Sequence, residues 1–242
     1  MIRGAIFDVD GTLLNSMMIW DNAPERYLKK KGLCAEEGLA DILFSMTMKE
    51  SAEYFKEKYK ISESTETISS EINEIVAEFY KKEVQPKPGV LDFLKELKER
   101  KIPMTVATST DRWLIEMAFQ RLDMEKYFDK IFTCTEVGFG KSQPDIFFAA
   151  STFMNTIPQD TWVFEDGLYS IQTANRAGYR TVGIYDESSQ KDQEMIKKTA
   201  EEYLTDFQQR KQLWKKLIKN EESSIDAYHT KEMVSQQQLH MV

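Results

Sequence analysis

The chain has 242 residues, 41% of them apolar and 30% charged, which is an ordinary composition for a globular protein. Acidic residues outnumber basic ones by 40 to 32, and the formal net charge is −8. Because no long block of lysine or arginine interrupts this acidic background, nucleic acids and anionic membranes are not expected as partners. The length allows one large domain, or one domain that carries a smaller insert.

The positions of cysteine and histidine exclude several kinds of site. Cys34 and Cys134 lie far apart and fit no metal or redox spacing, so we expect two thiols in a reducing compartment. His229 and His240 both fall in the polar last twenty residues, which leaves no histidine in the body of the chain for a triad or a zinc site. No apolar run approaches the ~18 residues of a membrane span, and the N-terminus has no signal pattern. We therefore expect a cytoplasmic protein whose chemistry uses carboxylates, lysine and hydroxyls.

Short apolar, β-branched segments alternate with helical patterns through most of the second half of the chain, which is typical of a parallel sheet wrapped by helices. Val90, Phe93 and Leu97 illustrate the helical spacing of the apolar residues between these segments. The predicted fold class is α/β, with a Rossmann-like parallel sheet core flanked by helices. Strands are predicted at residues 2–8, 104–108, 130–134, 161–165 and 181–185.

Residues 16–83 interrupt this alternation and have a purely helical pattern. Thr47 to Glu50 has the form of a capping box, and Gly32 ends an earlier helical segment. Apolar residues on one face indicate another helix: Ile68, Ile72, Ile75, Val76 and Phe79. We therefore predict a helical cap domain inserted after the first strand.

The prolines in residues 85–89 stop the last cap helix and return the chain to the sheet. The predicted core domain consists of residues 1–15 and 84–220, and the cap domain of residues 16–83. A last helix is expected around residues 207–219. Beyond it, residues 221–242 are polar and aperiodic and form a predicted flexible tail.

Two carboxylates, Asp8 and Asp10, stand where the first predicted strand ends, and Gly11 makes the turn after them. Because side chains alternate along extended backbone, the two carboxylates point the same way. Like charges that lie so close need a cation or a shared proton, which is how metal and acid/base sites are built. Taken alone, the pair fits a solvated loop equally well.

Three further polar groups follow the ends of other predicted strands. Thr108 and Ser109 end the second strand where a helix starts, a position that can seat an anion or simply cap the helix. Lys141 follows the third strand, and Glu165 with Asp166 ends the fourth, although a lone lysine and a capping acid are common on surfaces. Because ligands of such sheets bind beyond the carboxyl ends of the strands, we predict that these residues share one site.

These residues resemble, in the same order, the four motifs of the haloacid dehalogenase superfamily. Residues 8–12 resemble the first motif, Thr108 the second, Lys141 the third, and the pair at 165–166 the fourth. The resemblance covers roughly residues 1–207. The position of the helical insert is similar to that of the α-helical cap in the β-phosphoglucomutase-like subfamily.

The resemblance implies a phosphoryl transfer through an aspartyl-phosphate. Asp8 would attack phosphorus, and Asp10 would first protonate the leaving oxygen and then activate water. Thr108, the Ser109 N–H and Lys141 would stabilise the oxygens of the transferring group. Asp10 favours phosphate chemistry, because the superfamily's dehalogenases and phosphonatases lack an aspartate at this position.

The same resemblance implies Mg2+ as the cofactor. Asp8, the backbone carbonyl of Asp10 and Asp166 would hold the ion, with Glu165 helping and water completing the octahedron. The expected function is a phosphatase for a small phosphorylated metabolite, with a monomer as the default oligomeric state. A phosphosugar mutase and a non-catalytic regulatory module that binds Mg2+ and a phosphorylated ligand remain alternatives, whereas a receiver module is shorter and has no cap.

The cap departs from the related mutases at two positions. Trp20 stands where they carry a histidine, and residues 46–49 replace a Gly-x-x-Arg element, so hydrolysis is favoured. Trp20, Met17 and Met18 either line a substrate pocket or pack the cap against its hinge. Lys49, if it points inward, would suit a small sugar or nucleotide monophosphate.

The core departs from the family pattern in smaller ways. Ser142 replaces a common proline, Gly167 a serine and Ser170 a glycine. All charged groups stay in place, so these changes are expected to affect loop stiffness, Mg2+ geometry and rate rather than the class of reaction.

Overall fold

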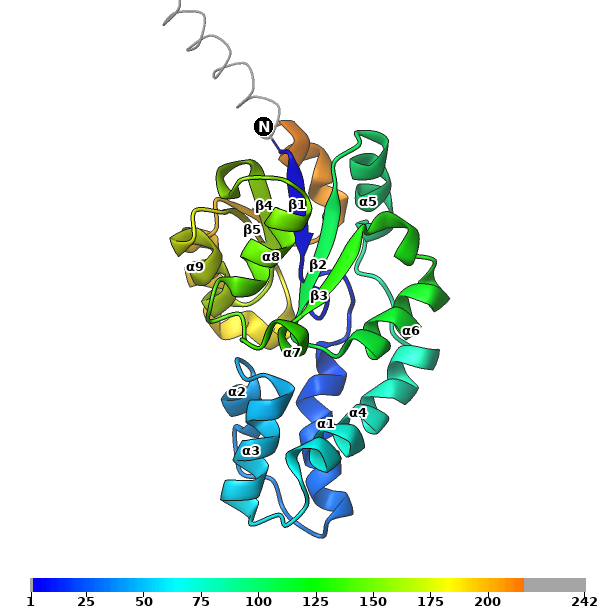
Figure 1. Cartoon of the computed structure of the whole chain (residues 1–242), viewed down its shortest axis with the longest axis vertical. Helices are drawn as coiled ribbons and strands as arrows, with labels where there is room; N and C mark the ends of the chain where they lie inside the picture. Colours follow the sequence, from blue (N-terminus) through cyan, green and yellow to red (C-terminus); the bar gives the residue numbers. More distant parts are fainter. Residues whose placement is uncertain (1, 216–242) are drawn as a thin grey trace, which may run out of the picture.

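The computed structural model describes residues 2–215, in which six parallel strands form one sheet with the order β3-β2-β1-β4-β5-β6 (Figure 1). The strands are β1 Gly4–Phe7, β2 Met104–Thr108, β3 Lys130–Thr133, β4 Thr161–Glu165, β5 Arg180–Ile184 and β6 Glu202–Leu204. The predicted Rossmann-like sheet is confirmed. Its central strand β1 pairs with β2 on one side and β4 on the other.

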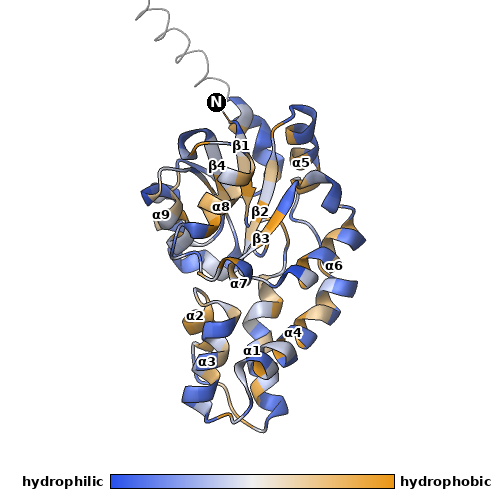
Figure 2. Cartoon of the chain, viewed as in Figure 1, coloured by the Kyte–Doolittle hydropathy of each residue, from blue (hydrophilic) through white to orange (hydrophobic). Residues whose placement is uncertain are grey.

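The strands form here because their apolar runs can be buried on both faces, as parallel sheets require. In β1, Phe7 stacks on Phe164 and packs edge-on against Phe93, while its neighbour Ile6 shares the opposite cluster with Ile146. The core helices that cover the sheet are α5 Val90–Glu99, α6 Arg112–Leu122, α7 Cys134–Val137, α8 Asp145–Phe153, α9 Leu168–Arg176 and α10 Gln193–Thr199. Figure 2 shows the apolar strands between helices whose outer sides are hydrophilic.

A second group of helices lies beyond the carboxyl ends of the strands (Figure 1). These helices are α1 Met17–Lys30, α2 Leu39–Leu43, α3 Met48–Tyr59 and α4 Thr65–Lys82, and we call them the cap. The predicted capping box is confirmed, since the Thr47 hydroxyl accepts from the Glu50 N–H and the Glu50 carboxylate accepts from the Thr47 N–H. The domain boundaries at 15/16 and 83/84 stay a prediction.

The observed strands differ from the predicted ones in several bounds. The first spans Gly4–Phe7 rather than 2–8, and the fifth spans Arg180–Ile184 rather than 181–185. The third ends at Thr133, because Cys134 already begins a helix. Strand β6 was not predicted at all, since it is a three-residue edge strand that is only partly buried and has no long apolar run.

The predicted last helix starts as a 3-10 turn at Phe207–Gln209 and continues as helix through residues 210–215. The rest of that prediction, the predicted tail at 221–242 and both histidines lie outside the described residues. Within residues 2–215, no helix combines the length and the apolar character that crossing a membrane requires.

Candidate active site

Two neighbouring segments connect the cap to the core beside the end of β1. The Asn15 N–H donates to the Gln85 carbonyl at 2.9 Å, and the Lys87 N–H donates to the Leu13 carbonyl at 2.8 Å. These backbone hydrogen bonds hold the entering and leaving chain together. They fix the cap over the carboxyl edge of the sheet, by which we mean the C-terminal ends of β1 to β4 and the segments that follow them.

A cavity of about 140 Å3 lies between the carboxyl edge and the cap. Seven residues that the sequence predicted for the site all line it: Asp8, Asp10, Thr108, Ser109, Lys141, Glu165 and Asp166. Parallel pairing explains this convergence, since the Asp8 N–H still donates to the Phe164 carbonyl one residue past β1. The strand ends therefore deliver their side chains to one place.

A buried ion pair forms the floor of the cavity. The Lys141 ammonium donates to Asp8 Oδ1 and, at 2.7 Å, to Glu165 Oε1. Burial raises the pKa of the Asp8 carboxyl to about 7, against the lowering effect of the Lys141 charge. Burial acts to lower the pKa of Lys141, but the charges of Asp8 and Glu165 outweigh it and raise this pKa well above its ordinary value. Lys141 therefore stays charged.

Glu165 is held on both of its oxygens. Oε1 also accepts from the Ser170 hydroxyl at 2.7 Å, and Oε2 accepts from the Gly167 N–H at 2.9 Å. Ser170, which departs from the family pattern, thus supplies a hydrogen bond to this carboxylate. Because its lone pairs are largely engaged, Glu165 is better suited to orienting Lys141 than to binding an ion directly.

The acidic cluster has the character of a divalent cation site. One carboxylate oxygen each of Asp8, Glu165 and Asp166 lies within 4.8 Å of the others. Asp8 Oδ2 and Asp166 Oδ2 are buried without a hydrogen-bond partner, which is costly for an oxygen anion unless a cation is present. Burial and the neighbouring carboxylates raise the pKa of Asp166 well above its ordinary value. These residues therefore fit a hard cation with oxygen ligands.

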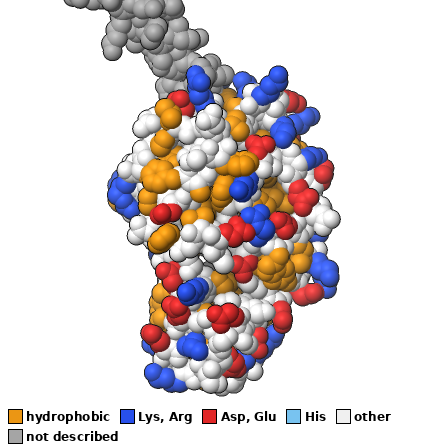
Figure 3. Space-filling model, viewed as in Figure 1, with side chains coloured by type: hydrophobic (Ala, Val, Ile, Leu, Met, Phe, Trp, Pro, Cys, Tyr) orange, Lys and Arg blue, Asp and Glu red, His pale blue; other side chains and the backbone are white. Residues whose placement is uncertain are grey.

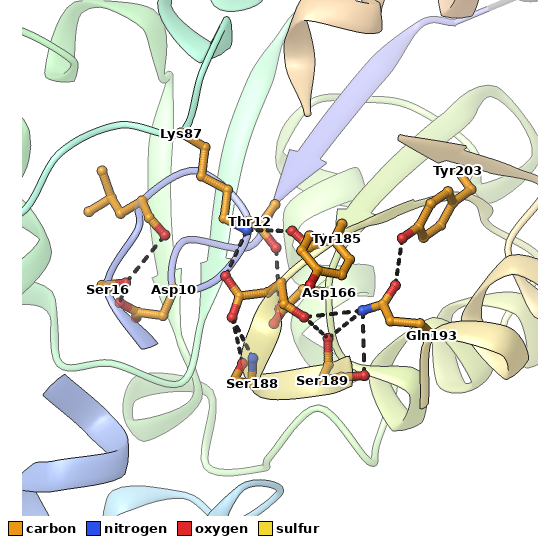
Figure 4. Close-up of polar contacts among 12 residues, drawn as sticks. Asp10, Thr12, Ser16, Lys87, Asp166, Tyr185, Ser188, Ser189, Gln193 and Tyr203 are labelled. Carbon is orange, nitrogen blue, oxygen red and sulfur yellow. Dashed lines mark hydrogen bonds and ion pairs between the residues drawn. The ribbon is translucent and has the colours of Figure 1, made fainter. Parts of the chain in front are cut away.

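Backbone and hydroxyl groups shape this cluster. The Thr12 hydroxyl donates to Asp166 Oδ1 at 3.4 Å (Figure 4). Gly11 has a φ of +84°, and a Cβ atom at this position would lie 2.3 Å from Asp166 Oδ2. A side chain at residue 11 would thus fill the space in front of the acidic cluster.

Asp10 is held by three hydroxyl groups. Its carboxylate accepts from Ser16 at 2.6 Å (Figure 4), from Thr110 at 2.7 Å, and from Tyr80 of cap helix α4. Sequence reasoning missed all three as site residues. Thr110 lies two residues after Thr108 and could have been found from that spacing. Tyr80 could not, because in the sequence it is indistinguishable from the other apolar-face residues of an amphipathic helix.

The two residues at the end of β2 have different partners. The Thr108 hydroxyl is fully buried and accepts from the Thr110 N–H at 3.1 Å. Ser109 lies 3.5 Å from the buried thiol of Cys134. Thr108 therefore keeps its hydroxyl hydrogen for another acceptor at the cavity.

The predicted cap residues have mixed outcomes. Met17 and Trp20 line the cavity, and the Trp20 indole N–H also donates to the Tyr80 hydroxyl at 2.9 Å, so Trp20 both lines the pocket and packs the cap. Met18 is 61% exposed and does not line this cavity. The condition stated for Lys49, that it points inward, is not met, because its side chain is exposed at the first turn of α3 and does not line the cavity.

A second buried ion pair, between Lys87 and Asp186, lies where the chain leaves the cap. The ammonium of Lys87, in the segment that leaves the cap, contacts Asp186 at 2.7 Å and the Tyr185 carbonyl at 2.5 Å. The Asp186 carboxylate also accepts from the N–H and the hydroxyl of Ser188. Both charged side chains are buried, so this pair joins the cap connection to the end of β5.

The fold combines a parallel sheet, a helical insert after its central strand and a buried lysine–carboxylate cluster at the carboxyl edge. A family model described as haloacid dehalogenase-like hydrolase matches residues 5–184. The chain therefore belongs to the haloacid dehalogenase-like hydrolase family, as its four motifs indicated.

Relatives and solved structures agree with this assignment. A phosphorylated carbohydrates phosphatase of Thermotoga maritima is 27% identical over 181 residues, which cover 75% of this chain and 84% of that protein. A fructose-1-phosphate phosphatase of Escherichia coli is 28% identical over 181 residues, covering 75% and 95%. The crystal structure of β-phosphoglucomutase from Clostridium difficile matches with a TM-score of 0.76 over 93% of this chain and 100% of that chain. At 21% identity, this last likeness shows the fold alone.

Proposed function

We propose that this protein is a Mg2+-dependent phosphatase that hydrolyses a small phosphorylated metabolite through an aspartyl-phosphate on Asp8. One observation carries the proposal: Lys141 holds one oxygen of the buried Asp8 carboxylate, while the other oxygen has no hydrogen-bond partner at the cavity. The relatives are by name phosphatases of phosphorylated carbohydrates and fructose 1-phosphate, which supports this reaction class.

The reaction has two halves. In the first, an Asp8 oxygen attacks phosphorus, the bond between phosphorus and the ester oxygen breaks, and Asp10 gives its proton to the leaving alcohol. In the second, Asp10 takes a proton from water, whose oxygen attacks phosphorus and breaks the acyl-phosphate bond. Inorganic phosphate leaves and the Asp8 carboxylate is restored. The hydroxyls of Ser16 and Thr110 orient Asp10 for both proton transfers.

Donors at the cavity floor would stabilise the phosphoryl group during transfer. Lys141 lies against Asp8 and supplies positive charge, and the Thr108 hydroxyl and the Ser109 N–H follow the end of β2. Fixed donors of this kind act strongly in a buried site because they need no reorganisation when charge develops on the phosphoryl oxygens.

Asp8, Asp166 and the backbone carbonyl of Asp10 would hold Mg2+, and Glu165 would support them through Lys141. When bound, the ion neutralises the negative charge that a phosphate meets on approaching Asp8. The oxygen-only ligand set and the two unpartnered carboxylate oxygens favour Mg2+ over softer metals.

A phosphosugar mutase is the weaker alternative. A mutase must hold a sugar bisphosphate and therefore needs a second cation for the second phosphate group. Among the described residues that line the cavity, Lys141 is the one cationic side chain. It already forms ion pairs with Asp8 and Glu165. We also expect the enzyme to work in the cytoplasm, because Cys34 and Cys134 are both free thiols.

The proposal is tested by phosphate release from p-nitrophenyl phosphate with Mg2+ or EDTA. We expect hydrolysis that requires the metal and falls by at least about 1,000-fold in Asp8→Asn, which removes the nucleophile. Asp92→Asn is the matched control, because Asp92 lies on α5 and pairs with Arg210 far from the cavity. Well-folded protein without metal-dependent turnover would instead favour the non-catalytic binding module.

A further inference from the structure

The cavity has two chemically different ends. Its floor carries all of the charged lining residues, Asp8, Asp10, Lys141, Glu165 and Asp166. The side chains that the cap contributes are apolar or aromatic, with Ser51 as the exception among the described residues. We call six of them the cap wall: Trp20, Leu43, Phe44, Met46, Met48 and Phe55.

We propose that the natural substrates are phosphate monoesters of small apolar or aromatic alcohols, selected by the cap wall. This inference rests on the proposed phosphatase function and names its substrate class. With the phosphate at the acidic and lysine-bearing floor, the organic part of the substrate can only extend toward the cap, where it meets apolar side chains.

The cap wall offers almost nothing to a polyol. The Trp20 indole N–H is already donated to the Tyr80 hydroxyl. The Ser51 hydroxyl is therefore the one side-chain polar group of the described cap lining without a hydrogen-bond partner. A sugar or glycerol leaving group would bury several hydroxyls against carbon, and each unpaired hydroxyl opposes binding.

The charged side chains of the cap lie elsewhere. Figure 3 shows lysine, arginine, aspartate and glutamate side chains of both signs on the outside of the cap. Lys49, which follows Met48 directly, is exposed. A second phosphate or a carboxylate on the substrate would therefore meet no free cation at the cap wall.

The wall is continuous where the cap meets the core. The rings of Phe44 and Tyr169, a core residue that also lines the cavity, meet edge to face with centroids 6.1 Å apart. The cavity volume of about 140 Å3 includes the floor as well as the cap end, so the organic part of the substrate must be small. A short branched chain or a single ring is the upper limit of its size, and the flexible Met46 and Met48 side chains can adapt to several shapes.

Two pairs of substrates with similar carbon skeletons test the inference. Propyl phosphate is compared with glycerol 3-phosphate, and cyclohexylmethyl phosphate with glucose 6-phosphate. We expect kcat/KM to favour the apolar member by about tenfold in the first pair and about 100-fold or more in the second, since added hydroxyls find no partners. Equal values, or a preference for either polyol ester, would overturn the inference.

Two isosteric variants connect the preference to the cap wall. Met46→Gln places an amide in the wall and is expected to reduce the cyclohexylmethyl-to-glucose selectivity ratio at least about tenfold. Met18→Gln, on an exposed residue outside this cavity, should leave the ratio unchanged. An unchanged ratio in Met46→Gln, with thermal unfolding like that of the native protein, would contradict the assignment to the cap wall.

Acetyl phosphate separates this inference from the function on which it rests, because its leaving group is too small to fill the cap end of the cavity. Turnover of acetyl phosphate that depends on Mg2+ and Asp8, combined with a preference for polyol esters, would remove the inference and leave the phosphatase intact. Absence of Asp8-dependent turnover on acetyl phosphate and on all four esters would remove both.

Discussion

The hydroxyl of Tyr80, in the last turn of cap helix α4, donates a hydrogen bond to the carboxylate of Asp10 in the core. Tyr80 is fully buried and receives the Trp20 indole N–H at the same oxygen. Burial and the nearby Asp10 charge raise the pKa of Tyr80 well above its ordinary value, so the hydroxyl remains a donor. The proposed acid/base residue is therefore oriented partly by the cap.

Tyr80→Phe is expected to lower kcat by about 10- to 100-fold, the range for loss of one hydrogen bond to a charged group. KM should change much less, because the ring that packs the cap remains. Steady-state kinetics on p-nitrophenyl phosphate measures both constants. Tyr54→Phe serves as the control, since the Tyr54 hydroxyl donates to Glu36 at the far side of the cap. A normal kcat in Tyr80→Phe would mean that Ser16 and Thr110 hold Asp10 without help.

Asp166→Asn is expected to stabilise the metal-free protein at pH 7.5 by about 1–3 kcal/mol, because it removes a buried charge with an unpartnered oxygen. The folded-state pKa of Asp166 is raised above its unfolded value near 3.8. Such a carboxyl contributes its full stability below pH 3.8 and loses that contribution as the pH rises toward the folded pKa. The gain in the variant should therefore be smaller at pH 4.5 than at pH 7.5.

Thermal unfolding in EDTA at the two pH values measures this effect. Adding Mg2+ at pH 7.5 should raise the Tm of the native protein and have little effect on Asp166→Asn, which has lost a metal ligand. Asp160→Asn is a suitable control, because Asp160 is a partly exposed carboxylate paired with Arg3 at the opposite end of the sheet. A lower Tm of Asp166→Asn in EDTA at pH 7.5 would show that the carboxylate has a partner after all.

Lys87→Met should destabilise the fold by about 3–5 kcal/mol, because it leaves the buried Asp186 charge without its partner. Adding Asp186→Asn should recover part of the loss, since the unpaired charge is then gone. Urea unfolding of the two single variants and the double variant gives the coupling energy. Lys82→Met breaks an exposed pair with Glu78 and should change the unfolding free energy by less than about 0.5 kcal/mol. Additive losses would argue against direct coupling of Lys87 and Asp186.

The two cysteines should differ sharply in reactivity. Cys34 is exposed, whereas Cys134 is buried and its burial raises the pKa of the thiol. We expect an aromatic disulfide reagent to titrate one thiol rapidly in the native protein and the second only after denaturation. Cys34→Ser should abolish the fast phase and leave the slow one. Two fast thiols would contradict the burial of Cys134 beside Ser109.

Much of the core could be predicted because the apolar runs of its sequence are also the segments that the fold buries. The apolar runs that became β2 and β4 are buried along their whole length, so their sequence signal was strong and their bounds were predicted correctly. Strand β6 shows the opposite case, because a short, partly exposed edge strand depends on pairing with β5 and leaves little trace in composition.

The sequence by itself determined the seven polar residues at the carboxyl edge, since each lies at the end of a strand or in the segment after it, and parallel strands end on the same side. Only the tertiary structure decided how they are held and what faces them. Tyr80 lies 70 residues from Asp10 along the chain, and its contact exists because the connection to the cap places α4 beside the end of β1. In the same way, the exposure of Lys49 and the inward position of Met46 and Met48 follow from how α3 and the turn before it meet the core. Helical periodicity separates the faces of a helix, but it does not state which face will meet the site.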